Sequence, residues 1–304
     1  MRVSGNPNGN KWAAQMIAAI LSAVFETACL SDSLPCPCIF PSAYRLTTRV
    51  IIDYIELNMN QQLEKEIARA YPDRLTWQKC IPTFHPESAD EAADIFKRAG
   101  RFGQKLCISG FANTIDPVGE PFADLLVLKS DRLNMVVEIN SRDFHITVGA
   151  GFPVTEINRI ITPQGLWFPF GDVQYSGSFG GALASGLAAG DGVHTVPFSR
   201  HLLSVTAVLP DGAIVHPGAL TFKSVSGYDI SRLFYNSWGC LGMVIRLSFR
   251  VLPLSRKKEG SSRLTLLVPD RDGFTRQMAG DDPMAKLCRK IKNEFDPHGL
   301  LPII

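Results

Sequence analysis

The first regular pattern of hydrophobic and polar positions along this chain begins near residue 84. The segment "HPESADEAADIFKRAG" places Ala92, Ala93 and Phe96 on one face at helical spacing. Ser88 with Glu91 is typical of a capping box at its start, and Gly100 is the expected stop. Further helices are predicted over residues 59–71, 153–165, 273–279 and 281–295. The apolar face expected for the last of them consists of Met284, Leu287, Cys288, Ile291 and Phe295.

Short apolar or alternating runs predict the strands. They cover residues 105–109, 123–130, 134–140, 144–151, 243–254 and 263–270. Residues 202–218 read as a hairpin, because Pro210, Asp211 and Gly212 are turn residues between two apolar runs. Helices and hairpins that do not alternate strictly as strand–helix–strand favour an α+β fold of two small layers.

The first 58 residues differ from the rest. The stretch "WAAQMIAAILSAVF" follows Arg2 and Lys11 as in a signal peptide, but Glu26 and Thr27 stand where small cleavage-site residues belong. It is also shorter than the about 20 apolar residues of a membrane span. A third interpretation is that the native chain starts at Met59 and that residues 1–58 are a misassigned upstream extension.

Composition narrows the function classes. The chain has 304 residues and a net charge of +2, which gives no electrostatic case for nucleic acid or an acidic membrane. Its seven cysteines are odd in number and only Cys36 and Cys38 are close together, so neither a disulfide framework nor an iron–sulfur ligand set is indicated. We therefore expect reduced thiols in a cytoplasmic protein, with Cys107 and Cys288 in the core.

Two glycine-bearing segments are candidates for a phosphate site. Residues 109–114, "SGFANT", follow a predicted strand, and residues 176–181, "SGSFGG", lead into "ALASG". Successive backbone N–H groups in such turns, helped by a helix N-terminus, can surround a pyrophosphate. Either segment taken alone is better explained as a tight turn. Neither matches the Rossmann or P-loop glycine pattern.

The segment "KSVSGYDISRLF", followed by "GCLGMVIRLSFRV", resembles the signature of FAD-binding domains of the vanillyl-alcohol oxidase / p-cresol methylhydroxylase (PCMH) superfamily. The likeness is closest to the glycolate oxidase and D-lactate dehydrogenase branch, and the terminal "FDPHGLL" is similar to the ending of that branch. The matching positions in the first segment are Lys223, Val225, Gly227, Tyr228, Asp229, Arg232, Leu233 and Phe234. The resemblance implies a two-subdomain PCMH-type α+β fold with a truncated C-terminal cap.

The same resemblance implies a domain division and a cofactor site. Residues 1–58 are then an irregular extension, 59–83 a helix and lead-in, 84–254 the FAD-binding domain and 255–304 a remnant of the cap. The glycines admit backbone close to a nucleotide, while the flavin carries the redox chemistry. The implied cofactor-binding residues are Ser109, Gly110, Phe111, Ala112, Asn113, Thr114, Ser176, Gly177, Ser178, Gly180, Gly181, Ser185, Gly186, Gly242, Met243, Val244 and Ile245.

Several positions depart from the family pattern. Asn236 replaces a glycine, Cys240 a small residue, and Leu301 an asparagine expected near the flavin edge. Phe111 and Ala112 stand where many relatives carry a histidine that attaches the flavin, so non-covalent FAD is expected. His201 and Arg200 are weak candidates for catalysis, as are His194 and His216, and an ion pair is expected between Asp229 and Arg232.

Only 50 residues follow Leu254, which leaves room for about one strand and one helix of a cap. A substrate cavity needs several converging walls. The resemblance therefore implies the FAD-binding subunit of a glycolate oxidase-like complex that oxidises a small 2-hydroxy acid. Its partners would be a larger catalytic flavoprotein subunit and an iron–sulfur subunit, with membrane association only through the complex. Two alternatives stay open: a self-sufficient small flavoenzyme similar to UDP-N-acetylenolpyruvoylglucosamine reductase, and a flavin-free structural subunit.

Overall fold

The structure is a computed structural model that describes residues 59–78, 81–190, 194–220, 229–257, 265–267 and 269–303. The chain divides into two units, residues 1–53 and 54–304, and every described residue belongs to the second. The expectations for residues 1–58 lie outside the described residues, as do the motif positions Lys223, Val225, Gly227 and Tyr228.

One layer is a four-stranded sheet with helices α3 (Gln61–Ala70) and α4 (Ala89–Phe102). Its strands are β1 (Leu75–Gln78), β2 (Ile81–Phe84), β3 (Leu106–Ser109) and β4 (Leu126–Lys129), in the order β1-β2-β4-β3. Strand β4 pairs in parallel with β2 and β3, whereas β1 and β2 form an antiparallel pair. The sequence had indicated only a helix and a lead-in before residue 84, so β1 and β2 are additions.

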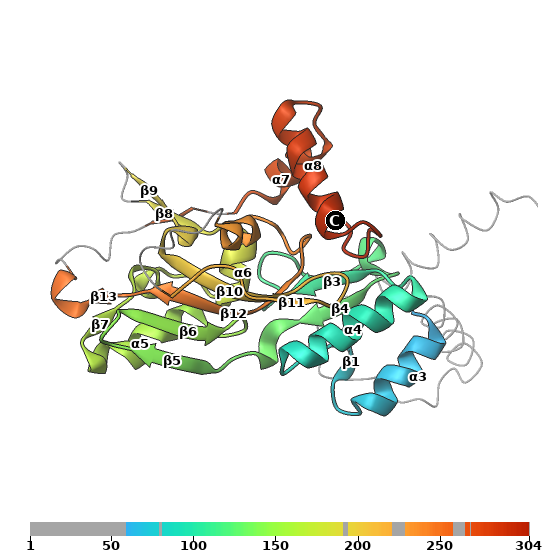
Figure 1. Ribbon diagram of the computed structural model, residues 1–304, viewed down its shortest axis with the longest axis horizontal. Coiled ribbons are helices and arrows are strands. Elements are labelled where there is room, and N and C mark those ends of the chain that lie inside the picture. The colour runs from blue at the N-terminus through green and yellow to red at the C-terminus, as the bar shows by residue number, and fades with distance from the viewer. Residues whose placement is uncertain are drawn as a thin grey trace, which may run out of the picture. The chain divides into compact units, whose positions relative to one another are not determined.

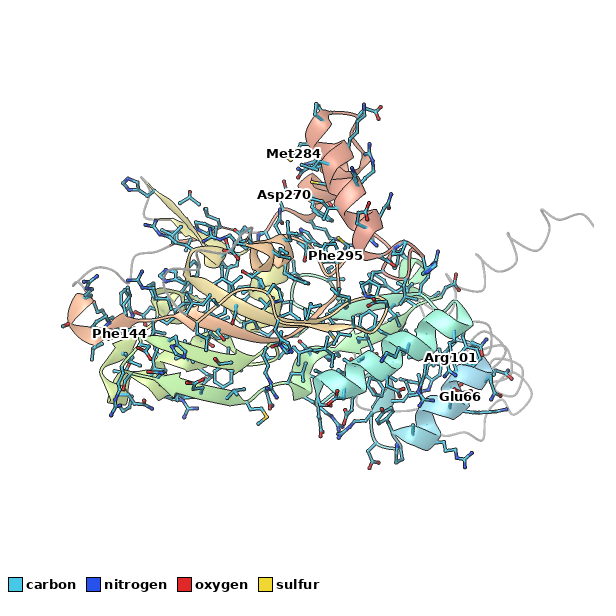
Figure 2. The ribbon with its side chains drawn as sticks, viewed as in Figure 1. Glu66, Arg101, Phe144, Asp270, Met284 and Phe295 are labelled. Atoms are coloured by element: carbon cyan, nitrogen blue, oxygen red, sulfur yellow. The ribbon has the colours of Figure 1, made fainter. Side chains whose placement is uncertain are left out.

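Helix α4 begins and ends for local reasons. The hydroxyl of Ser88 accepts a hydrogen bond from the Glu91 N–H at 3.1 Å, as the capping box predicts. The expected stop at Gly100 is wrong, because the helix continues to Phe102 and Gly103 ends it with a φ of 64°. Glu66 of α3 then binds Arg98 and Arg101 of α4, each at 3.2 Å, which ties the two helices together (Figure 2).

The second layer is a five-stranded antiparallel sheet in the order β11-β10-β12-β6-β5 (Figure 1). Its strands are β5 (Val136–Asn140), β6 (His145–Gly149), β10 (Leu202–Val208), β11 (Ile214–Val215) and β12 (Met243–Arg250). The predicted hairpin is therefore confirmed as β10 and β11. Helices α5 (Ile157–Ile161) and α6 (Phe179–Ala184) and the strand pair β7 (Leu166–Trp167) and β13 (Leu252–Pro253) belong to the same part of the chain. Its core is aromatic, with Phe168, Phe170, Phe179, Phe198 and Phe249 all buried.

The remaining elements are short. Strands β8 (Ala188–Gly190), β9 (Thr195–Pro197) and β14 (Thr265–Leu267) form a three-stranded sheet, and α7 (Arg271–Ala279) and α8 (Pro283–Phe295) follow it. Single 3₁₀ turns connect the elements; they cover Glu120–Phe122, Ser130–Arg132, Val154–Glu156, Thr162–Gln164, Pro169–Asp172, Phe198–His201, Ile230–Phe234 and Leu254–Arg256.

The apolar face predicted for α8 is only partly buried. Met284 and Leu287 are 56% and 50% exposed, and Met284 projects from the far end of the helix in Figure 2. The buried residues of α8 are Ala285 and Lys292 instead. Lys292 is buried because it pairs with Asp296, whose carboxylate also accepts the N–H groups of Leu300 and Leu301 at 2.8 Å. Cys288, expected in the core, is only partly buried, whereas Cys107 is buried as predicted.

Strand β12 connects the two layers. Met243 and Ile245 belong to the hydrophobic cluster of the first layer, and Val244 and Leu247 to that of the second. The mixed helices and sheets confirm the α+β class. Within the described residues, no helix has both the length and the apolar character needed to cross a membrane.

Candidate functional site

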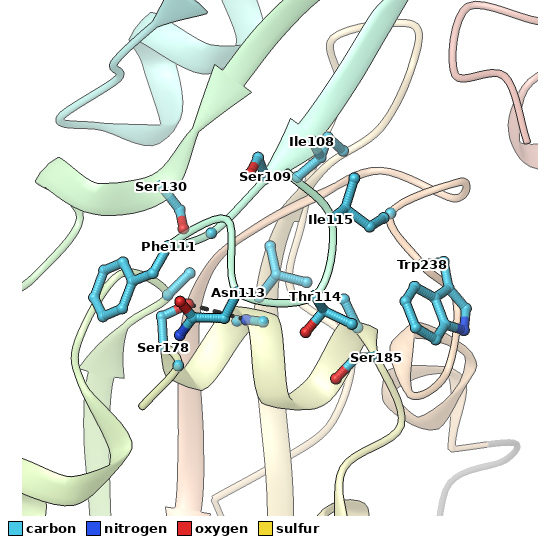
Figure 3. Close-up of a pocket in the computed structure, with 18 of the residues that line it drawn as sticks. Ile108, Ser109, Phe111, Asn113, Thr114, Ile115, Ser130, Ser178, Ser185 and Trp238 are labelled. Atoms are coloured by element: carbon cyan, nitrogen blue, oxygen red, sulfur yellow. Dashed lines mark hydrogen bonds between the residues drawn. The ribbon is translucent and has the colours of Figure 1, made fainter. Parts of the chain in front are cut away.

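A pocket lies where β3, α6 and the start of β12 meet (Figure 3). It contains about 730 Å³ of empty space, part of it open to solvent. Its walls come from five parts of the chain that are far apart in the sequence. They contribute Ile108, Ser109, Gly110, Phe111, Ala112, Asn113, Thr114, Ile115, Ser130, Ala150, Tyr175, Gly177, Ser178, Gly180, Gly181, Ala184, Ser185, Ser237, Trp238, Gly239, Gly242 and Val244.

The loop after β3 presents unused hydrogen-bond donors. Within the described part of the chain, no intramolecular hydrogen bond uses the backbone N–H groups of residues 110–114. Ala112 has a φ of 63°, and a left-handed residue within a turn is the geometry that aims successive N–H groups at one point. Residues 110–112 are half-buried and residues 113 and 114 are exposed, so these N–H groups are accessible to an anion in the pocket.

The loop approaches α6 closely at Gly110. A Cβ atom on Gly110 would stand 2.9 Å from the Ser178 hydroxyl, so a side chain there would push the two segments apart. The Asn113 amide also donates a hydrogen bond to the Ser176 hydroxyl at 3.0 Å. The sequence predicted both segments, and the structure places them side by side.

The second glycine segment lines the pocket, but the backbone N–H groups of residues 179–181 are already used in hydrogen bonds within the protein. The N–H groups of Phe179, Gly180 and Gly181 bond to Phe152 O, Ala150 O and the Ser178 hydroxyl, respectively. Helix α6 has only six residues. An anion here would therefore find its free N–H donors in the loop after β3, and the glycines of α6 would allow it to approach.

Hydroxyl groups supply further polar contacts, and one of them comes from a residue that the sequence analysis missed. Tyr175 is buried, and its hydroxyl lies near those of Ser185 and Thr114. Burial raises the pKa of the Tyr175 phenol, and the Ser185 and Thr114 hydroxyls lower it by a smaller amount. The phenol therefore stays protonated at neutral pH. The Ser185 hydroxyl is buried without a hydrogen bond of ordinary geometry among the described residues. Tyr175 directly precedes "SGSFGG", which is the only sign of its role in the sequence.

The turn before β12 forms another wall. Asn236 has a φ of 57° and Trp238 a φ of 51°, and their N–H groups donate to Leu183 O and Ala184 O at the end of α6. Asparagine tolerates the left-handed region better than other side chains. The replacement of the family glycine by Asn236 is therefore compatible with the turn. Trp238, also missed from the sequence, lines the pocket at the end opposite Phe111 (Figure 3).

Four of the residues implied by the resemblance do not line this pocket. Because side chains alternate along a strand, Gly242 and Val244 face the pocket while Met243 and Ile245 are buried in the core behind it. Ser176 contacts the pocket only through Asn113, and Gly186 packs against Asn236.

The weak catalytic candidates lie elsewhere. His201 packs edge-on against Phe168 and Phe170, and neither it nor Arg200 lines the pocket. Burial and the nearby Arg200 charge lower the pKa of His201 to about 4. His194 and His216 do not line the pocket either. Among the described lining residues Tyr175 is the only titratable one, so redox chemistry at this site must come from a bound group.

Comparison with known proteins identifies the class. Residues 82–218 match the FAD binding domain family. This part of the chain is therefore similar to FAD binding domains, and the pocket is the candidate cofactor site.

The chain is also similar to several flavoproteins. It is 28% identical over 189 residues to an uncharacterized FAD-linked oxidoreductase of Mycobacterium tuberculosis, which covers 60% of this chain and 40% of that protein. It is 26% identical over 205 residues to a mitochondrial D-lactate dehydrogenase (cytochrome) of Arabidopsis thaliana, covering 62% and 35%. It is 27% identical over 179 residues to the glycolate oxidase subunit GlcD of Bacillus subtilis, covering 59% and 37%. The chain thus spans about two fifths of the length of these relatives.

The pocket fits FAD on three observations. The loop after β3 offers free N–H groups for a pyrophosphate, and the Ser185 hydroxyl is a buried group that still needs a partner. Gly181 leaves space between the Ser178 and Tyr175 hydroxyls that a side chain would narrow. These residues would hold the phosphates, and the apolar residues Ile108, Ile115 and Trp238 at one end of the pocket suit a planar ring.

Proposed function

We propose that this chain is the FAD-binding subunit of an oxidoreductase that acts on a small 2-hydroxy acid. The observation that carries the FAD site is the row of unused N–H groups in residues 110–114 beside a pocket of the FAD binding domain. The substrate class comes from the relatives, which include D-lactate dehydrogenases and a glycolate oxidase subunit. FAD, when bound, supplies the two-electron oxidation.

The pocket residues bind and orient but do not move the substrate proton. Oxidation of a 2-hydroxy acid needs a base for the hydroxyl proton and a cation for the carboxylate. Tyr175 keeps its proton at neutral pH, because burial raises its pKa, and no charged residue is among the described residues that line the pocket. The base and the cation must then come from outside these walls, which supports the need for a larger partner subunit.

The exposed apolar face of α8 is a candidate surface for binding that partner subunit. Met284 and Leu287 are half exposed on one face of the helix. Apolar side chains that are exposed together mark surfaces that other proteins cover. We also propose non-covalent FAD, since no histidine or cysteine is among the described residues that line the pocket.

The first test concerns the cofactor. The purified chain, loaded with FAD, is precipitated with acid, and the flavin is expected in the supernatant. Flavin that stays with the pellet would contradict the non-covalent site. A chain that never takes up FAD, although it is folded, would favour a flavin-free structural subunit.

The second test concerns the subunit role. The isolated, FAD-loaded chain is mixed anaerobically with excess glycolate or D-lactate, and the flavin absorbance is expected to stay unchanged. Adding the products of neighbouring genes should restore bleaching of the flavin. Rapid bleaching of the isolated chain would show a self-sufficient enzyme and refute the subunit proposal.

A further inference from the structure

Trp238 stands between two pockets. It lines the cofactor pocket together with Ile108, Ile115 and Gly239, and the same four residues line a second pocket. The second pocket is closed by the C-terminal part of the chain, through Phe274 of α7 and residues 301–303. The indole is thus part of a wall with the cofactor site on one side and the C-terminal segment on the other.

The backbone of Trp238 has an unusual conformation. Its φ of 51° lies in the left-handed region, which residues other than glycine, asparagine and aspartate seldom adopt. Such conformations persist where the surroundings hold them, and they cluster at ligand-binding sites. Here the Trp238 N–H donates to Ala184 O at 2.9 Å, which fixes the residue on the end of α6.

The side chain is held as firmly as the backbone. The indole N–H donates to the Asn236 side-chain oxygen at 2.9 Å. The Phe274 ring packs against the indole with 6.1 Å between ring centroids and 34° between ring planes. Phe274 lines only the second pocket, so it supports the indole from the side away from the cofactor.

The indole is attached to the end of α6 that is farther from Ser178. Ser178 is at the start of α6 and Ala184 at its end, and six helical residues rise about 9 Å. In Figure 3, Ser178 and Asn113 lie on the Phe111 side of the pocket, whereas Ile115 lies on the Trp238 side, where the Thr114 and Ser185 hydroxyls are also near. A phosphate held by residues 110–114 would therefore have an apolar wall within reach of the ring that it carries.

We infer that the Trp238 indole is a stacking wall for a planar ring of FAD, supported from behind by Phe274 of α7. The inference rests on the proposed FAD binding at this pocket. Ring stacking on an aromatic side chain is tolerant of which ring is bound, so adenine and isoalloxazine share this chemistry. The C-terminal segment then contributes to cofactor binding although it lies outside the matched FAD binding domain, residues 82–218.

The test uses three variants of the full chain. Trp238→Gly removes the ring and also removes the backbone strain, so the variant is expected to fold. Trp238→Phe keeps a ring, and Trp77→Phe is the control because Trp77 lies on β1 and does not line the pocket. Each protein is stripped of flavin and titrated with FAD, with ADP and with riboflavin phosphate, while tryptophan fluorescence and affinity are followed.

We expect FAD to quench tryptophan emission in the wild type and in Trp77→Phe, and this quenching to be largely lost in Trp238→Phe. FAD affinity should fall about tenfold in Trp238→Gly and about threefold or less in Trp238→Phe, in line with the usual strength of base stacking. Weaker ADP binding in the glycine variant would assign the wall to adenine, and weaker riboflavin phosphate binding to the flavin ring. Unchanged FAD affinity in Trp238→Gly, or full quenching in Trp238→Phe, would overturn the inference. Failure of the wild type itself to bind FAD would instead refute the proposed function.

Discussion

Two neighbouring glycines of the pocket differ in what a methyl group would meet. Gly181 lines the pocket, and a Cβ there would lie 3.2 Å from the Ser178 hydroxyl and 3.5 Å from the Tyr175 hydroxyl. A Cβ on Gly180 would lie 2.8 Å from the Ala150 Cβ and 3.0 Å from the Ala150 oxygen, inside the protein. A side chain at Gly181 is therefore expected to affect ligand binding, and one at Gly180 to affect folding stability.

This difference gives a paired prediction. The Gly181→Ala variant should be as stable as the wild type, because alanine favours a helix. Its FAD affinity should fall about tenfold or more, because the added methyl group narrows the pocket between the Ser178 and Tyr175 hydroxyls. Gly180→Ala should lower the free energy of unfolding by about 1–3 kcal/mol through overpacking. Flavin titration and urea unfolding of both variants distinguish the two effects. Equal FAD affinity in Gly181→Ala and the wild type would contradict this view of the pocket.

His201 makes stability depend on pH. Burial, with the Arg200 charge, lowers the folded-state pKa to about 4, below the ordinary value of about 6.5. The unfolded chain then binds more protons between these values, so the contribution is complete above pH 6.5 and is lost as the pH falls toward 4. A shift of this size corresponds to about 3 kcal/mol. His201→Met should therefore flatten the pH dependence of the free energy of unfolding between pH 6.5 and 4, and an unchanged slope would contradict the assignment.

At the residue scale the sequence identified the glycine loops but not the pocket walls. Residues 109–114 all line the pocket because consecutive residues of one loop stay together. Tyr175, Trp238 and Ser130 could not be found in this way, since only the fold brings them to the same place. Met243 and Ile245 were assigned to the cofactor because the residue pattern of β12 does not show which of its alternating side chains face the pocket. The predicted Asp229–Arg232 ion pair is confirmed at 2.7 Å, since its i,i+3 spacing is local.

At the scale of elements, the C-terminal turn is held by one carboxylate. Asp296 is fully buried, pairs with Lys292, and accepts the N–H groups of Leu300 and Leu301. The Leu106 N–H of β3 then donates to Leu300 O at 2.8 Å, so this turn is attached to the strand that leads into residues 110–114. The carboxylate thus supports both α8 and the cofactor loop.

Removing this carboxylate should be costly. Asp296→Ala leaves the Lys292 ammonium buried without a partner, and breaking a buried pair typically costs about 3–5 kcal/mol. The control is Glu156→Ala, which removes an exposed pair with Arg159 and should cost less than about 1 kcal/mol. Thermal unfolding of the two variants gives the comparison. A loss as small as that of Glu156→Ala would mean that the turn is held in another way.

The elements that the sequence predicted are the ones with long or distinctive patterns. Helix α4 and the hairpin of β10 and β11 show strong periodicity and turn residues. Strands β1, β2, β7, β8 and β9 have two to four residues each and were missed, because such strands depend on partners distant in sequence. The end of α4 was misplaced because Gly100 and Gly103 are both possible stops, and only the backbone conformation separates them.

At the scale of the whole molecule, the described fold begins at Met59. Met59 is buried at 4% exposure, and Asn60 caps α3 by accepting the N–H groups of Gln62 and Leu63. Leu63 and Ile67 of α3 are fully buried in the first layer. A chain that starts at Met59 is therefore expected to fold and to bind FAD with the affinity of the full chain. Size-exclusion chromatography and flavin titration check this, and loss of solubility or of flavin would show that residues 1–58 are required.

The whole-molecule function is the part that the sequence could reach only through resemblance. The resemblance to the PCMH superfamily implied FAD, and the match of residues 82–218 to the FAD binding domain family agrees with it. The substrate and the partner depend on walls that the described pocket does not contain. No local pattern in the chain could specify them.

Strand β12 contributes side chains to both hydrophobic clusters, and this affects how the protein unfolds. Side chains of this one strand belong to both hydrophobic clusters, Met243 and Ile245 to one and Val244, Leu247 and Phe249 to the other, so the two clusters are expected to lose their structure together. The described layers should then lose structure in a single cooperative transition, with coincident changes in every spectroscopic probe. A ligand bound beside Gly242 and Val244 would raise the midpoint of that whole transition, because binding to the native state alone stabilises everything that unfolds with it.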